Sequence, residues 1–461
     1  MNQKENVISA GQYIARFACG LSSGTLNDQQ RKIAYRSLLD TFCVAVAAHR
    51  DPTVNLARQY MLDFSGNGNA VIWVSGENVP AEMAAWCNAI ASHVLDYDDV
   101  LTPMRAHVSA ILVPALLALQ EKILETSPGF AVSYVAGFEV MAKFSRVMAL
   151  NHYTKGWHST SALGILGVTV ACCVLLELDE SQIVNALGLA VAQASGTREN
   201  FGSMAKSFQA GICASAAVRA TLLAQKGFTA APTAIDGPNG FMRLYADQED
   251  LSHVLSTLGQ YPLEIDAMGI DQKKYPCCYA IHRALDGVIG LSRDHSILAS
   301  DIESVIVLTS ARGREALIKN YPMNGLQGKF SMEYTLASAL IDQCVTMNTY
   351  TEHLFNRPIV KNLMLKIKLE EADGPVIPRW SEVTICHRDG RQWTRRVQVA
   401  HGDAPDPLSD EELMTKSFDC FKYAGFSGCA DLIAKNILDA NLPEKIRTAV
   451  CLEALKADEC H

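Results

Sequence analysis

The sequence predicts a mainly α protein with a smaller α+β domain, in which both chain ends form one large helical domain and a lid domain is inserted between them. Three observations predict this fold class. The first 260 or so residues carry apolar side chains at helical spacing, β-branched segments begin near residue 265, and helical spacing returns at Asp410 behind Ser409, a suitable N-cap. We therefore expect the helical domain at residues 1–265 and 401–461 and the α+β lid domain at residues 266–400.

Five segments of the first half have the apolar spacing of helices and the residues that suit helix ends. Asn27 or Asp28 can cap the first segment, and Gly227 follows the last. The fourth segment contains Gly164 and Gly167. Because glycine is a poor helix former, close packing of neighbouring helices has to explain these two residues. The five segments are 29–48, 80–95, 126–150, 162–176 and 208–226.

The middle of the chain mixes strand-like and helical segments. Residues 304–309 (SVIVLT) are rich in β-branched side chains, and residues 364–369 and 381–386 alternate between apolar and polar. The tripeptide at 388–390 (Arg-Asp-Gly) occupies the place of a hairpin turn, whereas residues 334–348 have helical spacing. This mixture is typical of an α+β domain.

Composition indicates a well-packed protein that binds neither nucleic acid nor membranes. The 461 residues are 49% hydrophobic and 19% charged, so the chain can bury a large core and disorder is not expected. A net charge of −9 leaves no basic excess for binding nucleic acid. The longest apolar run, Ala162–Leu176, is shorter than the roughly 20 residues that a membrane-spanning helix needs.

The 14 cysteines have neither disulfide nor metal-site spacing. No CxxC motif occurs, and the pairs Cys172-Cys173 and Cys277-Cys278 are adjacent in sequence, which disfavours pairing within each. The first residues contain no apolar leader segment. We therefore interpret most of the cysteines as small buried side chains in a reducing, cytoplasmic location.

Motifs for common cofactors are missing from the sequence. It contains no GxGxxG, no GxxxxGK[ST] and no HExxH. One GxSxG match, at residues 20–24, lies between helical stretches, whereas a nucleophile elbow follows a strand. The sequence therefore predicts chemistry by side chains alone, with no cofactor and no metal.

The first candidate cluster runs from His93 through Asp96, Asp98 and Asp99 to His107. Three carboxylates within four residues repel one another and need cationic or capping partners. One interpretation is a solvated acidic turn, and the other is an aspartate that orients a histidine as general acid or base. His107 is polar at the start of an apolar helix, which favours the second interpretation.

His158 and Lys206 are the next candidates. His158 precedes the glycine-rich helix, and the helix dipole there favours neutral imidazole, which is a base. The alternative is a simple capping residue. Lys206 stands between a glycine turn and an apolar helix, where it can anchor a carboxylate; the alternative is a solvated lysine.

Lys273 and Tyr334 complete the set. Lys273 belongs to KKYPCC at the junction of the two expected domains, and Tyr334 ends GKFSMEY. Tyr334 is either a phenolic proton donor or a buried structural tyrosine. In a chain of net charge −9, these separated basic and donor groups make sense if they converge on an anionic substrate. Spacing alone does not decide whether they converge.

Taken together, these segments resemble the MmgE/PrpD family. The motifs occur in family order over about residues 30–425: HVLDYDD, GWHSTSALG, GSMAKSFQAG, KKYPCC, YPMNGLQGKFSMEY and HGDAPDPLSDEEL. The family includes 2-methylcitrate dehydratase, cis-aconitate decarboxylase and iminodisuccinate epimerase. The resemblance implies a large helical domain with a smaller α+β lid, a homodimer, and no metal or organic cofactor.

The resemblance also implies a site in the cleft between helical domain and lid. Val100 stands where mammalian cis-aconitate decarboxylases have threonine, and the spacing from Asp96 to His107 is one residue longer than in the family. Arg105 is expected to add to carboxylate binding. Carried over by position, the site residues are Asp96, His107, His158, Lys206, Lys273 and Tyr334.

The family's reactions pass through a carbanion or enediolate beside a carboxylate, and such a species needs fixed cations where charge develops. We expect Lys206 and Lys273 to bind the substrate and supply those cations. His107 is the expected base, with Asp96 fixing its tautomer. We expect His158 or the phenol of Tyr334 to deliver the second proton.

The sequence is compatible with several functions. The leading one is a cofactor-independent lyase that dehydrates a small di- or tricarboxylate such as 2-methylcitrate. Alternatives are a cis-aconitate-type decarboxylase, or an epimerase of an iminodicarboxylate such as iminodisuccinate, in which His158 and Tyr334 face each other across the substrate. The least favoured hypothesis is a non-catalytic helical dimer that serves as a scaffold, because a cleft without catalytic function would not need these polar residues.

Overall fold

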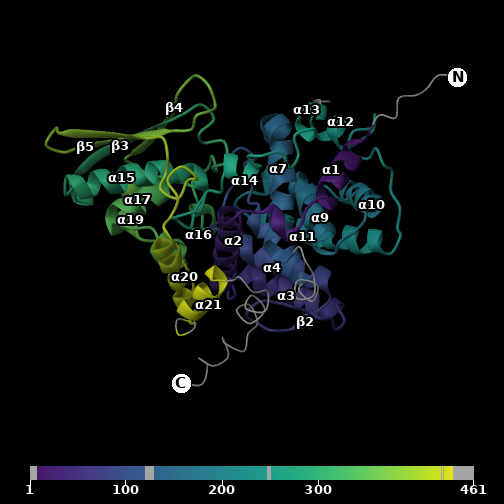
Figure 1. Ribbon diagram of the computed structural model, residues 1–461. Helices are drawn as coiled ribbons and strands as arrows, with labels where there is room; N and C mark the ends of the chain where they lie inside the picture. The colour runs from purple at the N-terminus through teal and green to yellow at the C-terminus, as the bar shows by residue number, and fades with distance from the viewer. Residues whose placement is uncertain (1–7, 120–128, 247–250, 427, 429, 440–461) are drawn as a thin grey trace.

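Helices account for most of the chain, and one small sheet lies to one side of them (Figure 1). The computed structural model describes residues 8–119, 129–246, 251–426, 428 and 430–439. Their buried apolar side chains form two clusters, a large one built mainly by helices from both parts of the chain and a smaller one between residues 275 and 385. The predicted fold class is therefore confirmed: a helical domain made by both chain ends, with an inserted α+β lid.

The first part of the chain supplies most of the helical domain. Asn27 caps the second helix in a capping box with Gln30, in agreement with the sequence. The predicted helix at 126–150 is found, although residues 126–128 lie outside the described residues. The elements are α1 (Ala10–Cys19), α2 (Asp28–Ala47), α3 (Pro52–Phe64), β1 (Ala70–Val71), β2 (Asn78–Val79), α4 (Ala81–Val94), α5 (Ser109–Ala118), α7 (Gly129–Thr154), α8 (Ser159–Ala162), α9 (Gly164–Leu175), α10 (Glu180–Val191), α11 (Ala205–Gln225), α12 (Phe241–Tyr245), α13 (Ser252–Leu255) and α14 (Glu264–Ala267).

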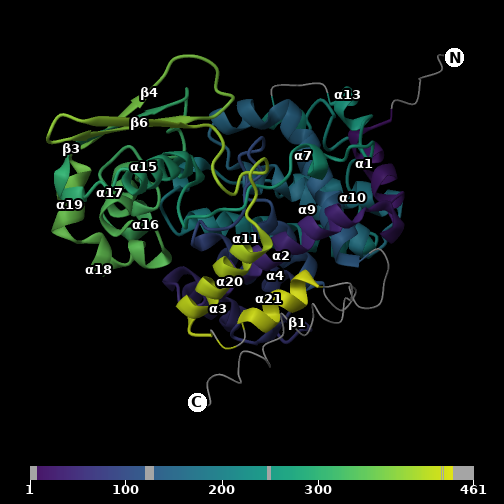
Figure 2. The same cartoon turned by 60° about the vertical axis from the view of Figure 1, so that its left-hand side comes forward.

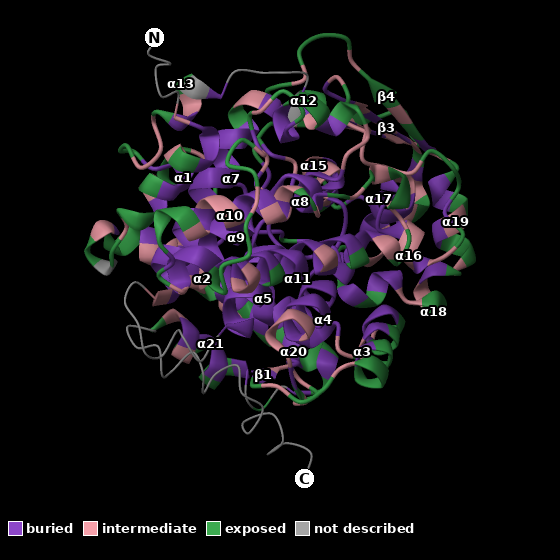
Figure 3. Ribbon diagram, turned by 90° about the vertical axis from the view of Figure 1, so that its right-hand side faces the viewer, coloured by how far each residue is buried: buried purple, intermediate pink, exposed green. Residues whose placement is uncertain are grey.

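Close packing of helices α4, α5, α9 and α11 forms the centre of this domain (Figure 3). Every residue of α5 and of α9 is buried. Where α7 crosses α9, a Cβ atom on Gly137 would lie 2.6 Å from the carbonyl oxygen of Gly167. Any larger side chain would push the two helices apart. The packing explanation for the helix glycines is therefore confirmed at Gly167.

Helix α11 is the one helix in the described part of the chain that is long and apolar enough to span a membrane by length and composition. The sequence analysis considered only the uninterrupted apolar run Ala162–Leu176 and therefore did not identify α11 as a candidate membrane span. In the structure 72% of its apolar window is buried, and its neighbours are α4, α9 and α10. Packing inside the helical domain thus accounts for its apolar surface.

The lid consists of a four-stranded sheet with helices on one face (Figures 1 and 2). Its strand order is β4-β3-β5-β6, in which β4 runs parallel to β3 and the other pairs are antiparallel. Helix α15 packs against β5 and β6, and α17 packs against α15. The elements are α15 (His282–Asp294), β3 (Ile302–Thr309), α16 (Gly325–Gly328), α17 (Met332–Asp342), α18 (Glu352–Phe355), α19 (Pro358–Met364), β4 (Ile367–Glu371), β5 (Ser381–His387) and β6 (Gln392–Val397).

Two predicted lid segments differ from the structure. The predicted strand at 364–369 is divided, because α19 ends at Met364 and β4 begins only at Ile367. The predicted helix at 334–348 ends at Asp342, because Gln343 adopts a left-handed conformation with φ 56° that stops the helix. The hairpin turn at 388–390 is confirmed between β5 and β6.

The chain finally returns to the helical domain through α20 (Asp410–Ala424) and α21 (Ala430–Leu438) (Figure 2). Ser409 caps α20 as predicted, in a capping box with Glu412. Helix α20 packs along α2, where the rings of Phe42 and Phe421 lie 6.3 Å apart. This return brings Lys416 into contact with the turn that follows α4, which carries residues of the candidate site.

Candidate active site

A cavity lies between the helical domain and the lid, with an empty volume of about 1150 Å³ including the space open to solvent. The helical domain contributes five of the predicted residues to its wall, and the lid contributes residues around 309–316 and 377–381. A pocket between two domains with convergent polar groups is the usual place for a small-molecule site. The five predicted residues are Asp96, Arg105, His107, His158 and Lys206.

The acidic turn after α4 is buried and not solvated. Asp96, Asp98 and Asp99 are each at most 2% exposed, so the interpretation as a solvated acidic turn is wrong. Asp96 has φ 54°, a left-handed conformation that turns the chain sharply at the end of the helix. Buried carboxylates must be paired or protonated, and these three use different partners.

Two lysines neutralise Asp96. Lys206, near the start of α11, hydrogen bonds Oδ1 of Asp96, and Lys273 Nζ lies 3.2 Å from the same oxygen and donates to the Asp96 carbonyl oxygen at 2.6 Å. Burial alone would raise the pKa of Asp96, but the two ammonium groups hold that pKa well below its ordinary value. Asp96 is therefore an ionised partner of two buried cations.

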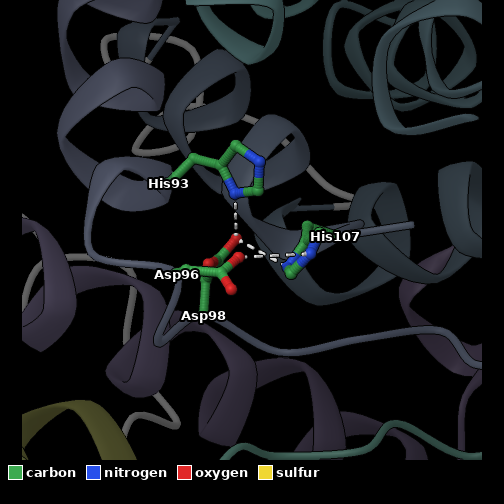
Figure 4. A group of neighbouring side chains, drawn as sticks. All are labelled: His93, Asp96, Asp98 and His107. Carbon is green, nitrogen blue, oxygen red and sulfur yellow. Dashed lines mark hydrogen bonds and ion pairs between the residues drawn. The ribbon is translucent and has the colours of Figure 1, made fainter. Parts of the chain in front are cut away.

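Asp98 joins the two histidines (Figure 4). Its Oδ2 lies 2.7 Å from Nδ1 of His93 and 3.1 Å from Nδ1 of His107. Asp96 Oδ1 lies 3.7 Å from the other nitrogen of His107, Nε2. Asp98 is thus the carboxylate nearest to His107, at Nδ1, and the role that the sequence analysis gave to Asp96 is corrected: that carboxylate is occupied by its lysines.

His107 has the properties of a base. Its side chain is 13% exposed, more than the 0–3% of His93, Asp96 and Asp98, and it lines the cavity. Burial lowers the pKa of His107 to about 4, in spite of the opposing effect of Asp98, and Lys273 lowers it further. The imidazole is therefore neutral near pH 7, as a proton acceptor must be.

His107 is expected to titrate near pH 4 in the unliganded protein, whereas an ordinary histidine titrates near pH 6.5. The measurement is a pH titration of the protein carrying ¹³Cε1-labelled histidine, with His107→Gln identifying the resonance. Because the folded pKa lies below the unfolded value of 6.5, this ring stabilises the fold least in acid: its contribution falls as the pH drops from 6.5 toward 4. A resonance that titrates near pH 6.5 would contradict this assignment.

His158 borders the cavity beside His93. It is 1% exposed, and its ring stacks at 5.9 Å from that of His93 and meets Phe201 edge-on at 5.1 Å. Neither ring nitrogen has a hydrogen-bond partner within the described structure, and no side-chain cap is formed with α8. Burial holds the pKa of His158 well below 6.5, with His93 and Lys206 adding to the effect. The capping interpretation is therefore wrong, and both nitrogens are buried beside the cavity without a hydrogen-bond partner among the described residues.

Two further buried lysines hydrogen bond the main chain of the segments that carry the site residues. Lys416 of α20 donates to the carbonyl oxygens of Tyr97 at 2.9 Å and Lys273 at 2.8 Å, and it pairs with Asp40 at 2.6 Å. Lys329 of the lid donates to the Leu95 carbonyl oxygen at 2.7 Å. The sequence analysis missed both lysines, because each acts on main-chain atoms more than 140 residues away.

Asp99 is separate from these ion pairs. It accepts a hydrogen bond from the hydroxyl of Ser109, which also contacts the hydroxyl of Tyr134. Burial and the nearby Asp40 raise the pKa of Asp99 to about 8. Asp99 is thus a protonated, neutral group at pH 7 and belongs to the support of the turn.

Tyr334 is not brought to the cavity, which corrects its expected role as proton donor. It is fully buried in the lid core, its hydroxyl donates to the carbonyl oxygen of Thr349, and its ring packs on Tyr350 and Phe355. Ser331 caps α17, and this start of the helix turns Tyr334 inward. The interpretation as a structural tyrosine is the correct one.

Lys273 and Arg105 are placed differently from a simple substrate anchor. Lys273 is 0% exposed and lies behind Asp96, so it reaches the cavity through that carboxylate. Arg105 lines the cavity, where it pairs with Glu315 of the lid at 2.8 Å and stacks over Tyr153. Its visible contacts therefore join the helical domain to the lid.

Four of these side chains also form a set that could hold a metal ion. The donor atoms lie within 4.8 Å of one another. The chemistry of the set argues against this use, because Lys206 and Lys273 already neutralise Asp96 and would repel a cation placed beside it. The four residues are His93, Asp96, Asp98 and His107.

Comparison with known proteins identifies the family. Residues 12–254 match the model of the MmgE/PrpD N-terminal domain, and residues 275–438 match that of the MmgE/PrpD C-terminal domain. The chain belongs to the MmgE/PrpD family. The predicted resemblance is thereby confirmed, and the N-terminal match includes the cavity residues Asp96, His107, His158 and Lys206.

Within the MmgE/PrpD family, the chain is similar to proteins named cis-aconitate decarboxylase. The human protein is 26% identical over 412 residues, which cover 86% of this chain and 84% of the relative. The mouse protein is 26% identical, with 86% and 83% covered, and that of Aspergillus terreus is 24% identical, with 90% and 89% covered. Decarboxylases are lyases, the enzyme class expected from the sequence.

Proposed function

We propose that this MmgE/PrpD protein is a lyase that acts on a small polycarboxylate by proton transfer at a carbon beside a carboxylate, without a further cofactor. The observation that carries the proposal is the neutral, cavity-lining His107, whose Nδ1 lies 3.1 Å from Asp98 and which lines the cavity together with the cation Lys206. A base next to fixed positive charge is what formation of a carbanion or enediolate requires. Among lyase reactions, we place decarboxylation of a cis-aconitate-like substrate first, because the similar proteins carry that name.

In such a decarboxylation the bond between a carbon atom and the leaving carboxylate breaks, and its electron pair stays on carbon, delocalised toward a remaining carboxylate. Lys206 is placed to stabilise that charge. A proton must then replace CO₂ on carbon. A bound polyanion raises the pKa of neighbouring imidazoles, so His107 or His158 can hold this proton in the complex although both are neutral in the free protein.

Dehydration of a 2-methylcitrate-like substrate is the second candidate. It is favoured by the low pKa of His107, since a ring that is neutral at rest can take an α-proton at once. His158 would protonate the leaving hydroxyl group. The epimerase hypothesis has less support, because Tyr334, its expected second acid, lies in the lid core.

Proton NMR in D₂O of the wild-type protein with cis-aconitate, citrate, 2-methylcitrate or iminodisuccinate tests the proposal. We expect loss of CO₂ from cis-aconitate, and a rate at least about 10²-fold lower with His107→Gln. Loss of water from 2-methylcitrate would replace the first candidate by the second. Deuterium uptake with epimerisation of iminodisuccinate alone would overturn the lyase proposal, and so would the absence of any reaction across the four compounds.

A further inference from the structure

The cavity contains more arginine than the protein itself neutralises. Arg105 and Arg198 share the carboxylate of Glu315, at 2.8 and 3.1 Å, and Arg283 pairs with Asp403 at 2.7 Å. These three arginines are therefore balanced by two carboxylates. Arg105 and Arg283 line the cavity, whereas Arg198 lines a neighbouring surface hollow. These ion pairs hold the lid segments at the cavity, and its excess of positive charge comes from two further arginines, Arg379 and Arg312.

Arg379 lines the same cavity and has no carboxylate partner. It donates to the carbonyl oxygen of Ala311 at 3.3 Å, and no carboxylate in the described part of the chain forms an ion pair with it. Burial lowers the pKa of Arg379 to about 10, with Arg105 contributing, so its guanidinium group remains charged at pH 7. A partly buried cation beside other cations is stabilised when an anion enters the cavity.

Arg312 lines both this cavity and a neighbouring surface hollow. It is exposed, and it too has no ion-pair partner among the residues that the structure describes. Its φ of 55° is a left-handed conformation that arginine rarely adopts. The turn that carries it is closed by a hydrogen bond from the Gly313 amide to the Ser310 carbonyl oxygen at 2.8 Å.

The reacting groups and these free arginines come from opposite domains. His107, His158 and Lys206 belong to the helical domain, whereas Arg312 and Arg379 belong to the lid. A substrate that contacts both walls needs one carboxylate at the reacting carbon and another directed to the lid. Arginine suits the second task, because its planar fork binds a carboxylate through two parallel hydrogen bonds.

We propose that Arg379, assisted by Arg312 at the cavity mouth, binds the substrate carboxylate farthest from His107 and thereby selects tricarboxylates over dicarboxylates. This inference rests on the proposed function, since it assigns a recognition residue to the same site. Arg379 is the main anchor because it is partly buried, and Arg312 contributes less because water screens its exposed charge.

The test is calorimetric binding of two unreactive probes, tricarballylate with three carboxylates and succinate with two, at fixed ionic strength. We expect wild type to bind tricarballylate at least about tenfold more tightly than succinate, and Arg379→Gln to remove this preference. Arg379→Lys should restore part of it, and Arg312→Gln should weaken tricarballylate binding less. Arg391→Gln is the control, because Arg391 is a lid arginine outside the cavity that pairs with Asp389.

Equal affinity of wild type for the two probes, or unchanged tricarballylate binding by Arg379→Gln, overturns the inference. Because neither probe reacts, the result is independent of the reaction in D₂O. Turnover of a substrate together with unchanged probe binding by Arg379→Gln would remove this inference alone. Arg379-dependent probe binding without turnover of any of the four compounds would remove the proposed function and leave the anion site.

Discussion

Replacing His107 with glutamine is expected to lower kcat/KM for the substrate by about 10²- to 10⁴-fold, the usual contribution of a positioned acid or base. The reason is the place of the ring: it lines the cavity, is neutral near pH 7, and has Asp98 3.1 Å from its Nδ1. Glutamine keeps polar atoms in the cavity but cannot accept and return a proton. The measurement is steady-state kinetics with the compound that reacts in the NMR assay.

The fold is expected to survive this change. Asp98 keeps its hydrogen bond with His93 at 2.7 Å. Because burial lowers the pKa of His107, this ring does not stabilise the fold in acid, and its removal costs no stability there. Circular dichroism and Tm should match wild type. His49→Gln is the control, because burial also lowers the pKa of His49 but this residue lies outside the cavity. Wild-type turnover by His107→Gln would disprove the assignment of the base.

Replacing Asp96 with asparagine is expected to destabilise the protein by about 3–5 kcal/mol, because it leaves buried ammonium groups without their counter-charge. Lys206 and Lys273 are 6% and 0% exposed, and both contact Oδ1 of Asp96. Asparagine adopts the left-handed conformation of this residue readily, so the change isolates the charge from the backbone. Urea unfolding at pH 7 measures the effect.

The loss should be smaller when Lys206→Met is already present, because one of the two stranded cations is then gone. Asp410→Asn serves as the control: Asp410 also lies between two cations, Lys32 and Arg36, but its side chain is 41% exposed, and a surface pair contributes only about 1 kcal/mol or less. Since the folded pKa of Asp96 is below its ordinary value, its contribution is complete above pH 3.8 and is lost as the pH falls further. Additive losses in the double variant would contradict this electrostatic explanation.

Most of the secondary structure could be predicted, because it depends on local patterns. Asn27 and Ser409 cap the helices that they were expected to cap, and the hairpin turn at 388–390 lies where its Asp-Gly pair places it. The errors came at boundaries. Gln343 stops a helix by its left-handed backbone, and residues 364–369 begin in a helix and end in a strand.

The site was predictable only in part, since spacing shows which residues are reactive but not where they meet. The family resemblance assembled Asp96, His107, His158 and Lys206, and all four line the cavity. The same resemblance placed Tyr334 beside them, whereas packing in the lid core turns its ring away. Neither the spacing nor the resemblance indicated that Asp98 lies closer to His107 than Asp96 does, at 3.1 Å against 3.7 Å.

By itself, then, the sequence determined the fold class, the family and the residue types available for catalysis, because these are written in local periodicity, caps and motifs. Only the tertiary structure decided the protonation and partners of those residues. The pKa of a histidine depends on burial and on charges that come from distant segments, as Lys273 shows by lowering the pKa of His107. The same holds for Lys416, which comes from the last part of the chain and hydrogen bonds the turn after α4. It also holds for Arg379, which forms no ion pair with a carboxylate of the described residues, a fact visible only in the folded cavity.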